Sequence, residues 1–215
     1  AREMGMIATF MAKPYAQQAG SGTHIHISIL NKNQKNIFSD PLNEIGSNIL
    51  HHAIGGLSKT MKESMAIYCP NANSYRRFQP DLYVPMAPTW GIDNRTVAIR
   101  IPAGTEKAKR IEHRVSGADA NPYLVVASIL AGIHYGITHK IAPPKISTGD
   151  AILKHKPSLP MTWVESLDAF SKSKILKKYF GKEFCHVYYE TKYKEMKKFD
   201  SHITPLELDW YLRTV

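Results

Sequence analysis

Six arginines stand between residues 73 and 114, most of them in segments with the pattern of β-strands. An arginine side chain is charged at every usable pH and presents a planar fork of hydrogen-bond donors. Several such charges on neighbouring strands would repel one another unless an anion lay between them. We therefore expect a fold whose strands share a face that receives a polyanion, such as a phosphate chain, or a carboxylate. The segments that contain these arginines are residues 73–78, 94–102 and 109–114.

Residues 24–30 have the clearest strand pattern, because polar and apolar residues alternate along them. On such a strand His24, His26 and Ser28 share one face, and the isoleucines between them point into a core. Glycines before this strand and asparagines after it indicate turns at both of its ends. Further strands are predicted over residues 6–14, 96–102 and 110–115.

Helical patterns account for most of the remaining sequence. A long helix is predicted over about residues 41–68, with Gly55 and Gly56 tolerated inside it. A strongly apolar helix is predicted over about residues 119–138, and the proline-punctuated residues 70–88 are predicted to form a loop. The C-terminal part indicates three or four short helices. Strands first and helices afterwards favour the α+β fold class.

Composition restricts the kind of protein. A chain of 215 residues that is 43% hydrophobic and 21% charged suits one soluble globular domain. Its longest apolar run, residues 123–133, is far too short to span a membrane. The formal charge of +10 would fit a nucleic-acid partner, but much of the excess consists of lysines between residues 140 and 198. Since these lysines follow helical patterns, we interpret them as a solvated helical surface and predict neither a nucleic-acid nor a membrane partner.

The two cysteines indicate a reducing compartment. Cys69 and Cys185 lie far apart in segments of different kind, so free thiols are predicted rather than a disulfide. We accordingly predict a cytoplasmic protein. The chain starts with Ala1 and has no signal-peptide pattern there. We expect it to be part of a longer protein.

Two groups of residues could bind a metal ion. His24 and His26 share a strand face, but a pair of surface histidines would give the same pattern. Arg110, Glu112 and Arg114 also share one face. Glu112 could be the carboxylate of a structural ion pair, or a metal ligand between phosphate-binding arginines. Either group taken alone leaves both interpretations open.

The order of several motifs along the chain carries a family resemblance. The motifs are Gly20-Ser-Gly-Thr-His24, Asn73-Ser-Tyr-Arg-Arg77, Asn94-Arg95, Arg100-Ile-Pro102 and residues 110–122. The chain resembles the C-terminal part of the catalytic domain of glutamine synthetases over most of residues 6–140. That resemblance implies an α+β fold with a curved antiparallel sheet flanked by helices. It also implies that residues 1–215 form part of such a domain, with the N-terminal domain and the upstream catalytic part lying outside them.

The resemblance implies a role for each residue of the ATP and metal sites. His24 and Glu112 match two ligands of a Mg²⁺ or Mn²⁺ ion beside the nucleotide phosphates. The ATP-binding residues divide into those that line the ribose and adenine and those that hold the phosphates. The first group is His26, Ser28 and Lys107, and the second is Arg95, Arg100 and Arg110.

The resemblance also implies a glutamate site. Gly20 matches a backbone contact to glutamate, and Arg77 and Arg114 match the residues that hold its carboxylate and the acyl-phosphate intermediate. Arg95, Arg100 and Arg114 are accordingly the predicted catalytic residues, because each would stabilise the phosphoryl group during its transfer. Bringing ATP and a carboxylate together joins two anions, which arginines and a divalent cation can neutralise.

The predicted reaction is the ATP-dependent ligation of glutamate to an amine through γ-glutamyl phosphate. Glutamine synthetases carry an acidic flap residue near their ammonium substrate, but this chain has Tyr83 there, in residues 80–85. An aromatic face suits an alkylammonium group. The sequence resembles that of the γ-glutamylpolyamine synthetase branch of the family, which uses amines such as putrescine. The alternatives are a glutamine synthetase that uses ammonia and a non-catalytic relative or binding module.

The resemblance further implies an incomplete active site. The other metal-binding glutamates of the family lie upstream of this sequence. So does a domain that supplies an aspartate across a subunit boundary. The whole protein is therefore expected to be a large homo-oligomer. Residues 1–215 alone are expected to be inactive.

Overall fold

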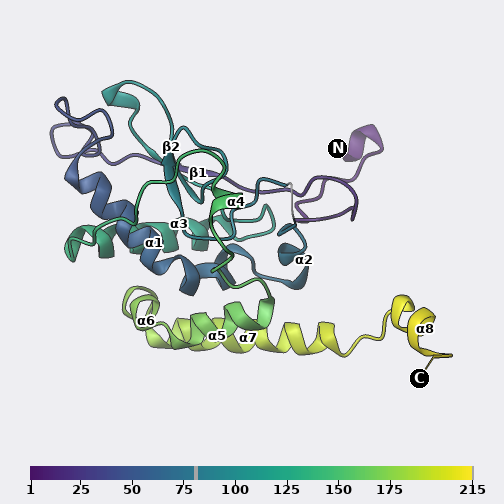
Figure 1. Cartoon of the computed structure of the whole chain (residues 1–215). Coiled ribbons are helices and arrows are strands. Elements are labelled where there is room, and N and C mark those ends of the chain that lie inside the picture. Colours follow the sequence, from purple (N-terminus) through teal and green to yellow (C-terminus); the bar gives the residue numbers. More distant parts are fainter. Residues whose placement is uncertain (80–81, 215) are drawn as a thin grey trace.

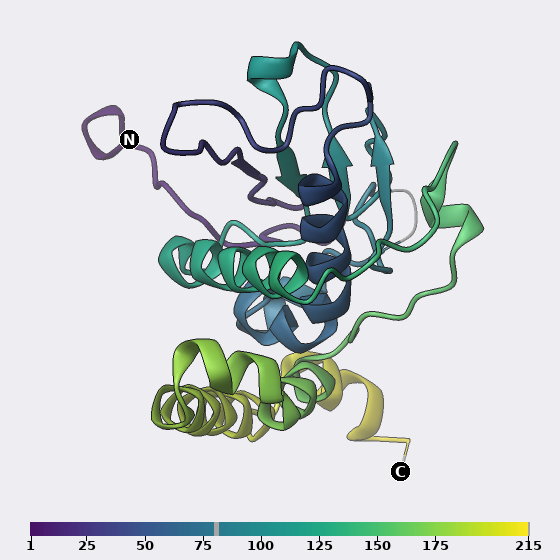
Figure 2. The same ribbon diagram turned by 90° about the vertical axis from the view of Figure 1, so that its left-hand side faces the viewer.

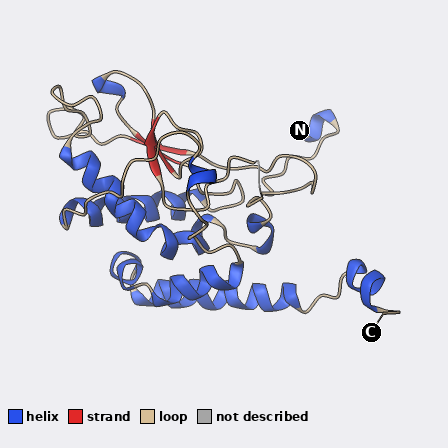
Figure 3. Ribbon diagram, viewed as in Figure 1, coloured by secondary structure: helices blue, strands red, loops and turns tan. Residues whose placement is uncertain are grey.

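The computed structural model describes residues 1–79 and 82–214 of the chain. It is an α+β structure in which a small open sheet lies on one side of the helices, as Figures 1 and 3 show. In Figure 2 the sheet lies above helices α1 and α3, and α5, α6 and α7 form a further layer beneath them. The predicted fold class is therefore confirmed.

The described sheet has four strands in the order β1-β4-β3-β2. The pairs β1–β4 and β4–β3 are antiparallel, but β2 and β3 run parallel. The expectation of an antiparallel sheet was therefore wrong for this pair. Residues 93–98 form a short crossover that returns the chain to the same direction, beginning at Asp93 with a left-handed φ of 46°. The strands are β1 (Ile25–Ile27), β2 (Trp90–Ile92), β3 (Ile99–Ile101) and β4 (Ile111–His113).

The strand predictions for residues 24–30, 96–102 and 110–115 are confirmed, although each strand is shorter than predicted. The strand predicted over residues 6–14 was wrong, because this segment forms no strand pairing within the described chain and is exposed apart from Ala12 and Lys13. β2 was missed because proline-rich sequence precedes it. Its Trp90 is buried and donates from the indole nitrogen to the carbonyl of Pro144 at 2.7 Å, a contact that local sequence does not reveal.

The two central helices are α1 (Asn48–Tyr68) and α3 (Pro122–Thr138), which pack against each other. Helix α1 begins at residue 48 rather than near residue 41, because Asp40 and Asn43 accept hydrogen bonds from nearby backbone N–H groups and hold the preceding residues in turns. Ser47 then caps the helix by accepting from the N–H of Leu50 at 3.2 Å.

Four helices follow residue 160 in the described chain, as predicted, but α7 (Lys182–Asp200) has 19 residues and is longer than predicted. Helix α8 extends away from the rest of the molecule in Figure 1, and none of its residues is buried. No helix within residues 1–79 and 82–214 is long and apolar enough to cross a membrane. The remaining helices are α2 (Ala72–Tyr75), α4 (Ala151–Lys154), α5 (Trp163–Lys172), α6 (Lys174–Phe180), α7 (Lys182–Asp200) and α8 (Pro205–Tyr211), with short 3-10 helices η1 (Arg2–Met4) and η2 (Glu106–Ala108).

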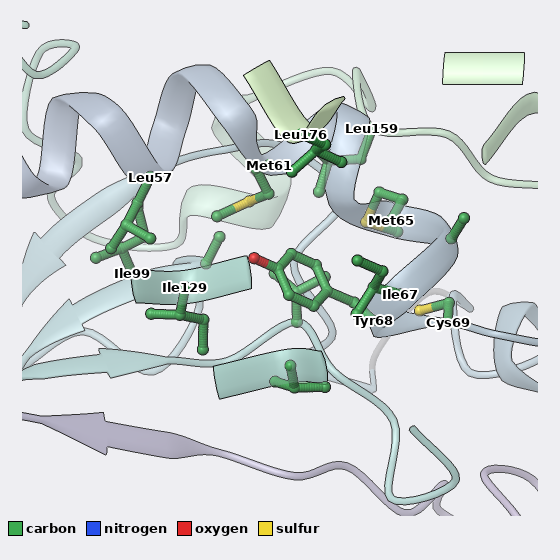
Figure 4. Packing of buried hydrophobic residues seen from close by; sticks show 14 of the residues in the cluster. Leu57, Met61, Met65, Ile67, Tyr68, Cys69, Ile99, Ile129, Leu159 and Leu176 are labelled. Carbon is green, nitrogen blue, oxygen red and sulfur yellow. The ribbon is translucent and has the colours of Figure 1, made fainter. Parts of the chain in front are cut away.

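One hydrophobic core joins the sheet to the helices. Figure 4 shows side chains of α1 converging with those of the sheet, α3 and α6. At the end of α1, the ring of Tyr68 lies inside this cluster, and its hydroxyl is 3.3 Å from the hydroxyl of Ser128. Cys69 and Cys185 are both buried and both free, as predicted. The hydrophobic core covers one face of the sheet, so the opposite face is available for polar residues.

Candidate functional site

Three polar residues form one row across the sheet. In the register of the strands, Glu112 on β4 lies opposite His26 on β1 and opposite Arg100 on β3. Residues that face each other across strands project on the same side of a sheet. Since β4 is an inner strand, Glu112 lies at the centre of the polar face.

Glu112 is the hub of a charged network. Its Oε1 accepts from Nη1 of Arg114 at 2.6 Å, and its Oε2 accepts from Nη1 of Arg100 at 2.9 Å. The Nδ1 atom of His24 lies 3.2 Å from the same Oε1. Arg100 also pairs with Asp93, so acidic and basic groups alternate along the network. Only 2% of Glu112 is exposed, which means that the arginines replace water around its carboxylate.

These neighbours shift the pKa values of both predicted metal ligands. Burial by itself would raise the pKa of Glu112, but hydrogen bonds and charges from Arg114 and Arg100 hold that pKa below its usual range. Burial, followed by the charge of Arg114, lowers the pKa of His24. At neutral pH the carboxylate is therefore ionised and the imidazole is neutral. Those are the protonation states that metal ligands require.

His24 and Glu112 carry donor atoms of the kind that a divalent ion binds, but two ligands are too few for a complete metal site. Their nitrogen and oxygen donors converge, and imidazole with carboxylate is acceptable to Mn²⁺. However, the described residues contain no group of three or more histidine, cysteine, aspartate or glutamate side chains that could hold a metal. These two residues could therefore supply only part of a metal site.

The predicted nucleotide residues are only partly brought together. The Nε of Arg110 donates to Nδ1 of His26 at 3.1 Å, which extends the polar face beyond Glu112. Ser28, Lys107 and Arg95 are exposed. The carbonyl of Arg95 accepts from Nη2 of Arg114 at 3.0 Å, so this residue is tied to the network through its backbone.

The three predicted substrate residues line one cavity. It has a volume of about 250 Å³ and also reaches His24, so it lies directly beside the Glu112 network. Tyr83 stands at this cavity with 64% of its surface exposed and a φ of 51°. Pro80 and Asp81, which belong to the predicted flap segment, lie outside the described residues. The cavity is lined by Ala19, Gly20, Gly22, His24, Arg77, Leu82, Tyr83, Val84 and Arg114.

Arg77 forms a charged wall of this cavity. Only 3% of it is exposed, and its Nη2 donates to the carbonyl of Val115 at 2.8 Å. A Cβ atom on Gly20 would lie 2.9 Å from Cγ of Arg77 and 3.0 Å from the carbonyl oxygen of Ala12. Glycine at position 20 is therefore needed for the turn to pass over this arginine.

Asp93 and Asp119 were missed as residues of the site. Asp93 pairs with Arg100, and Asp119 accepts hydrogen bonds from Asn71 and Ser74 near Arg77. The signal for Asp93 was its position directly before the Asn94-Arg95 motif. No local signal pointed to Asp119, because its partners lie more than forty residues away in sequence.

Comparisons with known proteins show the family of the chain. The sequence model of one protein family, described as the glutamine synthetase catalytic domain, matches residues 1–211 of the chain. The chain is 45% identical to gamma-glutamylputrescine synthetase PuuA of Escherichia coli K12, covering 97% of this chain and 44% of that protein. It is 38% identical to glutamate–isopropylamine ligase of a Pseudomonas species, covering 99% of this chain and 47% of that protein. It is 37% identical to glutamine synthetase of Sulfolobus acidocaldarius, covering 99% and 48%.

A comparison with solved structures shows a similar fold over almost the whole chain. The structure is similar to that of GmaS without ligand, with a TM-score of 0.87 and 28% sequence identity. The match covers 99% of this chain and 50% of that one, so the chain spans about half the length of the relatives that it matches. Because the family model spans almost all of the sequence, the chain belongs to the glutamine synthetase family and carries sequence of that family's catalytic domain.

Proposed function

We propose that the protein containing this chain is an ATP-dependent ligase that joins the γ-carboxylate of glutamate to an amine through γ-glutamyl phosphate. The observation that carries this proposal is the cavity in which Gly20, Arg77 and Arg114 meet His24 beside Glu112. Relatives that are named gamma-glutamylputrescine synthetase and glutamate–isopropylamine ligase support the reaction class. In this proposal residues 1–215 are part of the catalytic domain.

Unpaired donors in the network support the binding of anions. The Nε atoms of Arg77, Arg100 and Arg114 are buried and have no hydrogen-bond partner among the described residues. A buried donor without a partner costs about 1–3 kcal/mol. A carboxylate or phosphate oxygen that accepted from such donors would remove that cost and would gain a charge-assisted bond.

The proposed division of work follows from charge. Arg77 and Arg114 hold the glutamate carboxylate and the acyl phosphate that forms on it, and Arg95, Arg100 and Arg110 hold the ATP phosphates and stabilise the phosphoryl group during transfer. His24 and Glu112 would be two of the ligands of a Mg²⁺ or Mn²⁺ ion, which would further neutralise the phosphates. The nucleoside would lie along the remaining proposed ATP residues, which are His26, Ser28 and Lys107.

Exclusion of water is the remaining requirement. The γ-carboxylate oxygen attacks the terminal phosphorus of ATP, ADP leaves, and the acyl phosphate then awaits the amine. The amine nitrogen attacks the acyl carbon, phosphate leaves, and a proton is lost from the nitrogen. Leu82, Tyr83 and Val84 line the same cavity as Arg77 and Arg114 and would limit the access of water.

We propose that the amine is an alkylamine of the putrescine type. The exposed ring of Tyr83 stands at the cavity, and a cationic amine held against an aromatic ring gains about 0.5–2 kcal/mol. Ammonia is the second candidate, because relatives named glutamine synthetase share 37% identity with the chain. By family likeness we also propose that the protein is a large homo-oligomer of the cytoplasm.

The amine can be assigned by steady-state kinetics on the complete protein. We expect the specificity constant for putrescine to exceed that for ammonium, and Tyr83→Ala to raise the KM for putrescine several-fold while leaving the KM for ATP almost unchanged. Preference for ammonium would favour the glutamine synthetase alternative. A complete absence of metal-dependent ATP turnover with any amine would favour a non-catalytic relative.

The substrate cavity can be tested with Arg114→Ala in the complete protein. Loss of a guanidinium that acts on the transferring group should lower kcat by about 10²–10³. Lys172→Ala is a matched control, because Lys172 is an exposed cation that pairs with Asp168 on α5. Normal glutamate-dependent turnover in Arg114→Ala would refute the assignment of the cavity.

A further inference from the structure

Asp119 fastens helix α2 to the segment that follows β4. Its Oδ2 accepts from Nδ2 of Asn71 at 2.8 Å and from the hydroxyl of Ser74 at 2.7 Å. Asn71 is the N-cap of α2, and Ser74 lies in its only turn. One carboxylate oxygen therefore sets the position of this short helix relative to the sheet.

Arg77 follows directly from α2. Its N–H donates to the carbonyl of Ser74 at 3.4 Å, and its guanidinium extends beneath the glycine turns of the substrate cavity. A Cβ on Gly22 would lie 3.3 Å from Nη1 of Arg77, so this nitrogen lies close under the cavity wall. Any shift of α2 would therefore move the guanidinium as well.

Two unpaired atoms of opposite charge lie against the same glycine. The Oδ1 of Asp119 and the Nε of Arg77 are both buried and have no hydrogen-bond partner among the described residues. A Cβ on Gly117 would lie 2.2 Å from that Oδ1 and 3.5 Å from that Nε. Gly117 thus leaves room for the carboxylate and the guanidinium to be neighbours.

Arg77 needs a neighbouring negative charge. It is almost completely buried, yet within the described residues no carboxylate oxygen lies within 4.0 Å of its nitrogens. A buried charge without compensation is strongly destabilising. The Oδ1 of Asp119 lies just beyond ion-pair distance, against the same glycine as the Nε of Arg77, and is an unpaired anionic atom that can supply this compensation through space.

We propose that Asp119 is a positioning residue that provides the counter-charge of Arg77 and holds its guanidinium toward the substrate cavity. The inference rests on the proposed function, in which Arg77 binds the glutamate carboxylate. Asp119 itself does not line the cavity, so it acts through Arg77. It therefore governs the affinity for glutamate and has little influence on ATP, whose proposed arginines, Arg95, Arg100 and Arg110, do not line this cavity.

The test is a kinetic comparison of variants of the complete protein. Asp119→Asn keeps the shape of the side chain and removes its charge, and we expect the KM for glutamate to rise at least about tenfold. The KM for ATP should change by less than about twofold. Ser74→Ala removes one hydrogen bond but keeps the charge, so its effect should be much smaller. Asp168→Asn is the matched control, because it removes an exposed aspartate on α5.

A double variant separates this inference from the proposed function. If Asp119 acts through Arg77, then Asp119→Asn should add no further rise in the KM for glutamate to that of Arg77→Gln. A normal KM for glutamate in Arg77→Gln would refute the proposed function itself. A raised KM in Arg77→Gln with a normal one in Asp119→Asn would overturn the role of Asp119 alone.

Two further outcomes would also count against the role of Asp119. Equal increases in both KM values, or an equal effect of Ser74→Ala, would show that it only maintains the local fold. If Asp119→Asn does not fold, Asp119→Glu provides the test because it keeps the charge. A KM for glutamate within about threefold of wild type would then support the inference, and a tenfold increase would overturn it.

Discussion

At the scale of single residues, His113 shows how one strand separates two environments. Glu112 faces the polar side of β4, whereas the neighbouring His113 is 1% exposed and its ring lies 4.6 Å from that of Tyr68. Both ring nitrogens are buried without a partner among the described residues. Burial, followed by the charge of His24, lowers the pKa of His113 to about 3. The imidazole is therefore neutral in the folded protein at any ordinary pH.

This shift predicts a pH-dependent stability. In the unfolded chain His113 takes up a proton near pH 6.5, but the folded protein excludes that proton until about pH 3. Its contribution is fully present above pH 6.5 and is lost as the pH falls toward 3, by up to about 5 kcal/mol. We expect His113→Phe to reduce the acid sensitivity of the denaturation midpoint between pH 4 and 7.

The measurement is chemical denaturation of the metal-free protein at several pH values. His186→Phe is the matched control, because it replaces an exposed histidine of α7 with the same residue. Equal pH dependence in His113→Phe and in the wild-type protein would contradict the prediction.

At the scale of elements, glycines set the distance between α1 and α3. A Cβ on Gly56 would lie 2.1 Å from the carbonyl oxygen of Gly132 and 2.5 Å from Cα of Gly136. A Cβ on Gly136 would lie 2.1 Å from the carbonyl oxygen of His52. The two helix backbones therefore touch at this crossing. Glycines that seemed merely tolerated within a helix are required by the packing.

The crossing predicts an effect opposite to helix propensity. An alanine favours an isolated helix over glycine by about 1 kcal/mol. Gly56→Ala should nevertheless destabilise the protein by about 2–3 kcal/mol, because the added methyl group meets backbone that cannot rotate away. Lys59→Ala, at an exposed position three residues further along α1, should change the melting temperature little. A higher melting temperature in Gly56→Ala would contradict the prediction.

At the scale of the whole molecule, the described chain holds only part of what the proposed reaction needs. It spans about half the length of its relatives, and its predicted metal site has two donors. Strands β1 and β2 form the edges of its sheet. Apolar side chains of α8, such as Leu206 and Trp210, are more than half exposed.

This arrangement predicts that residues 1–215 expressed alone bind ATP weakly and form no γ-glutamyl amide. Arginines alone would neutralise the phosphates incompletely, and water would reach any acyl phosphate. The measurement is amide formation from glutamate, ATP and putrescine, with the complete protein as the positive control. Measurable synthesis by residues 1–215 would contradict the prediction.

Local periodicity accounts for the parts of the fold that were predicted. The alternation around residues 24–30 and 110–115 predicted which side chains share a face, and the apolar residues after Asn121 predicted α3. The same reasoning failed for residues 6–14, whose apolar side chains are exposed apart from that of Ala12. A strand needs a neighbour to pair with, and local sequence does not report whether that neighbour is present.

The sequence by itself determined the family, the α+β class and the kinds of chemical group available to the site, because these follow from ordered motifs and side-chain periodicity. Only the tertiary structure decided that Glu112 lies between His26 and Arg100, since strand register depends on pairing between distant segments. It also decided that Arg77 is buried beside Asp119. The two residues are 42 positions apart in the sequence. They lie against the same glycine, Gly117, because α2 is hydrogen-bonded to the loop that follows β4.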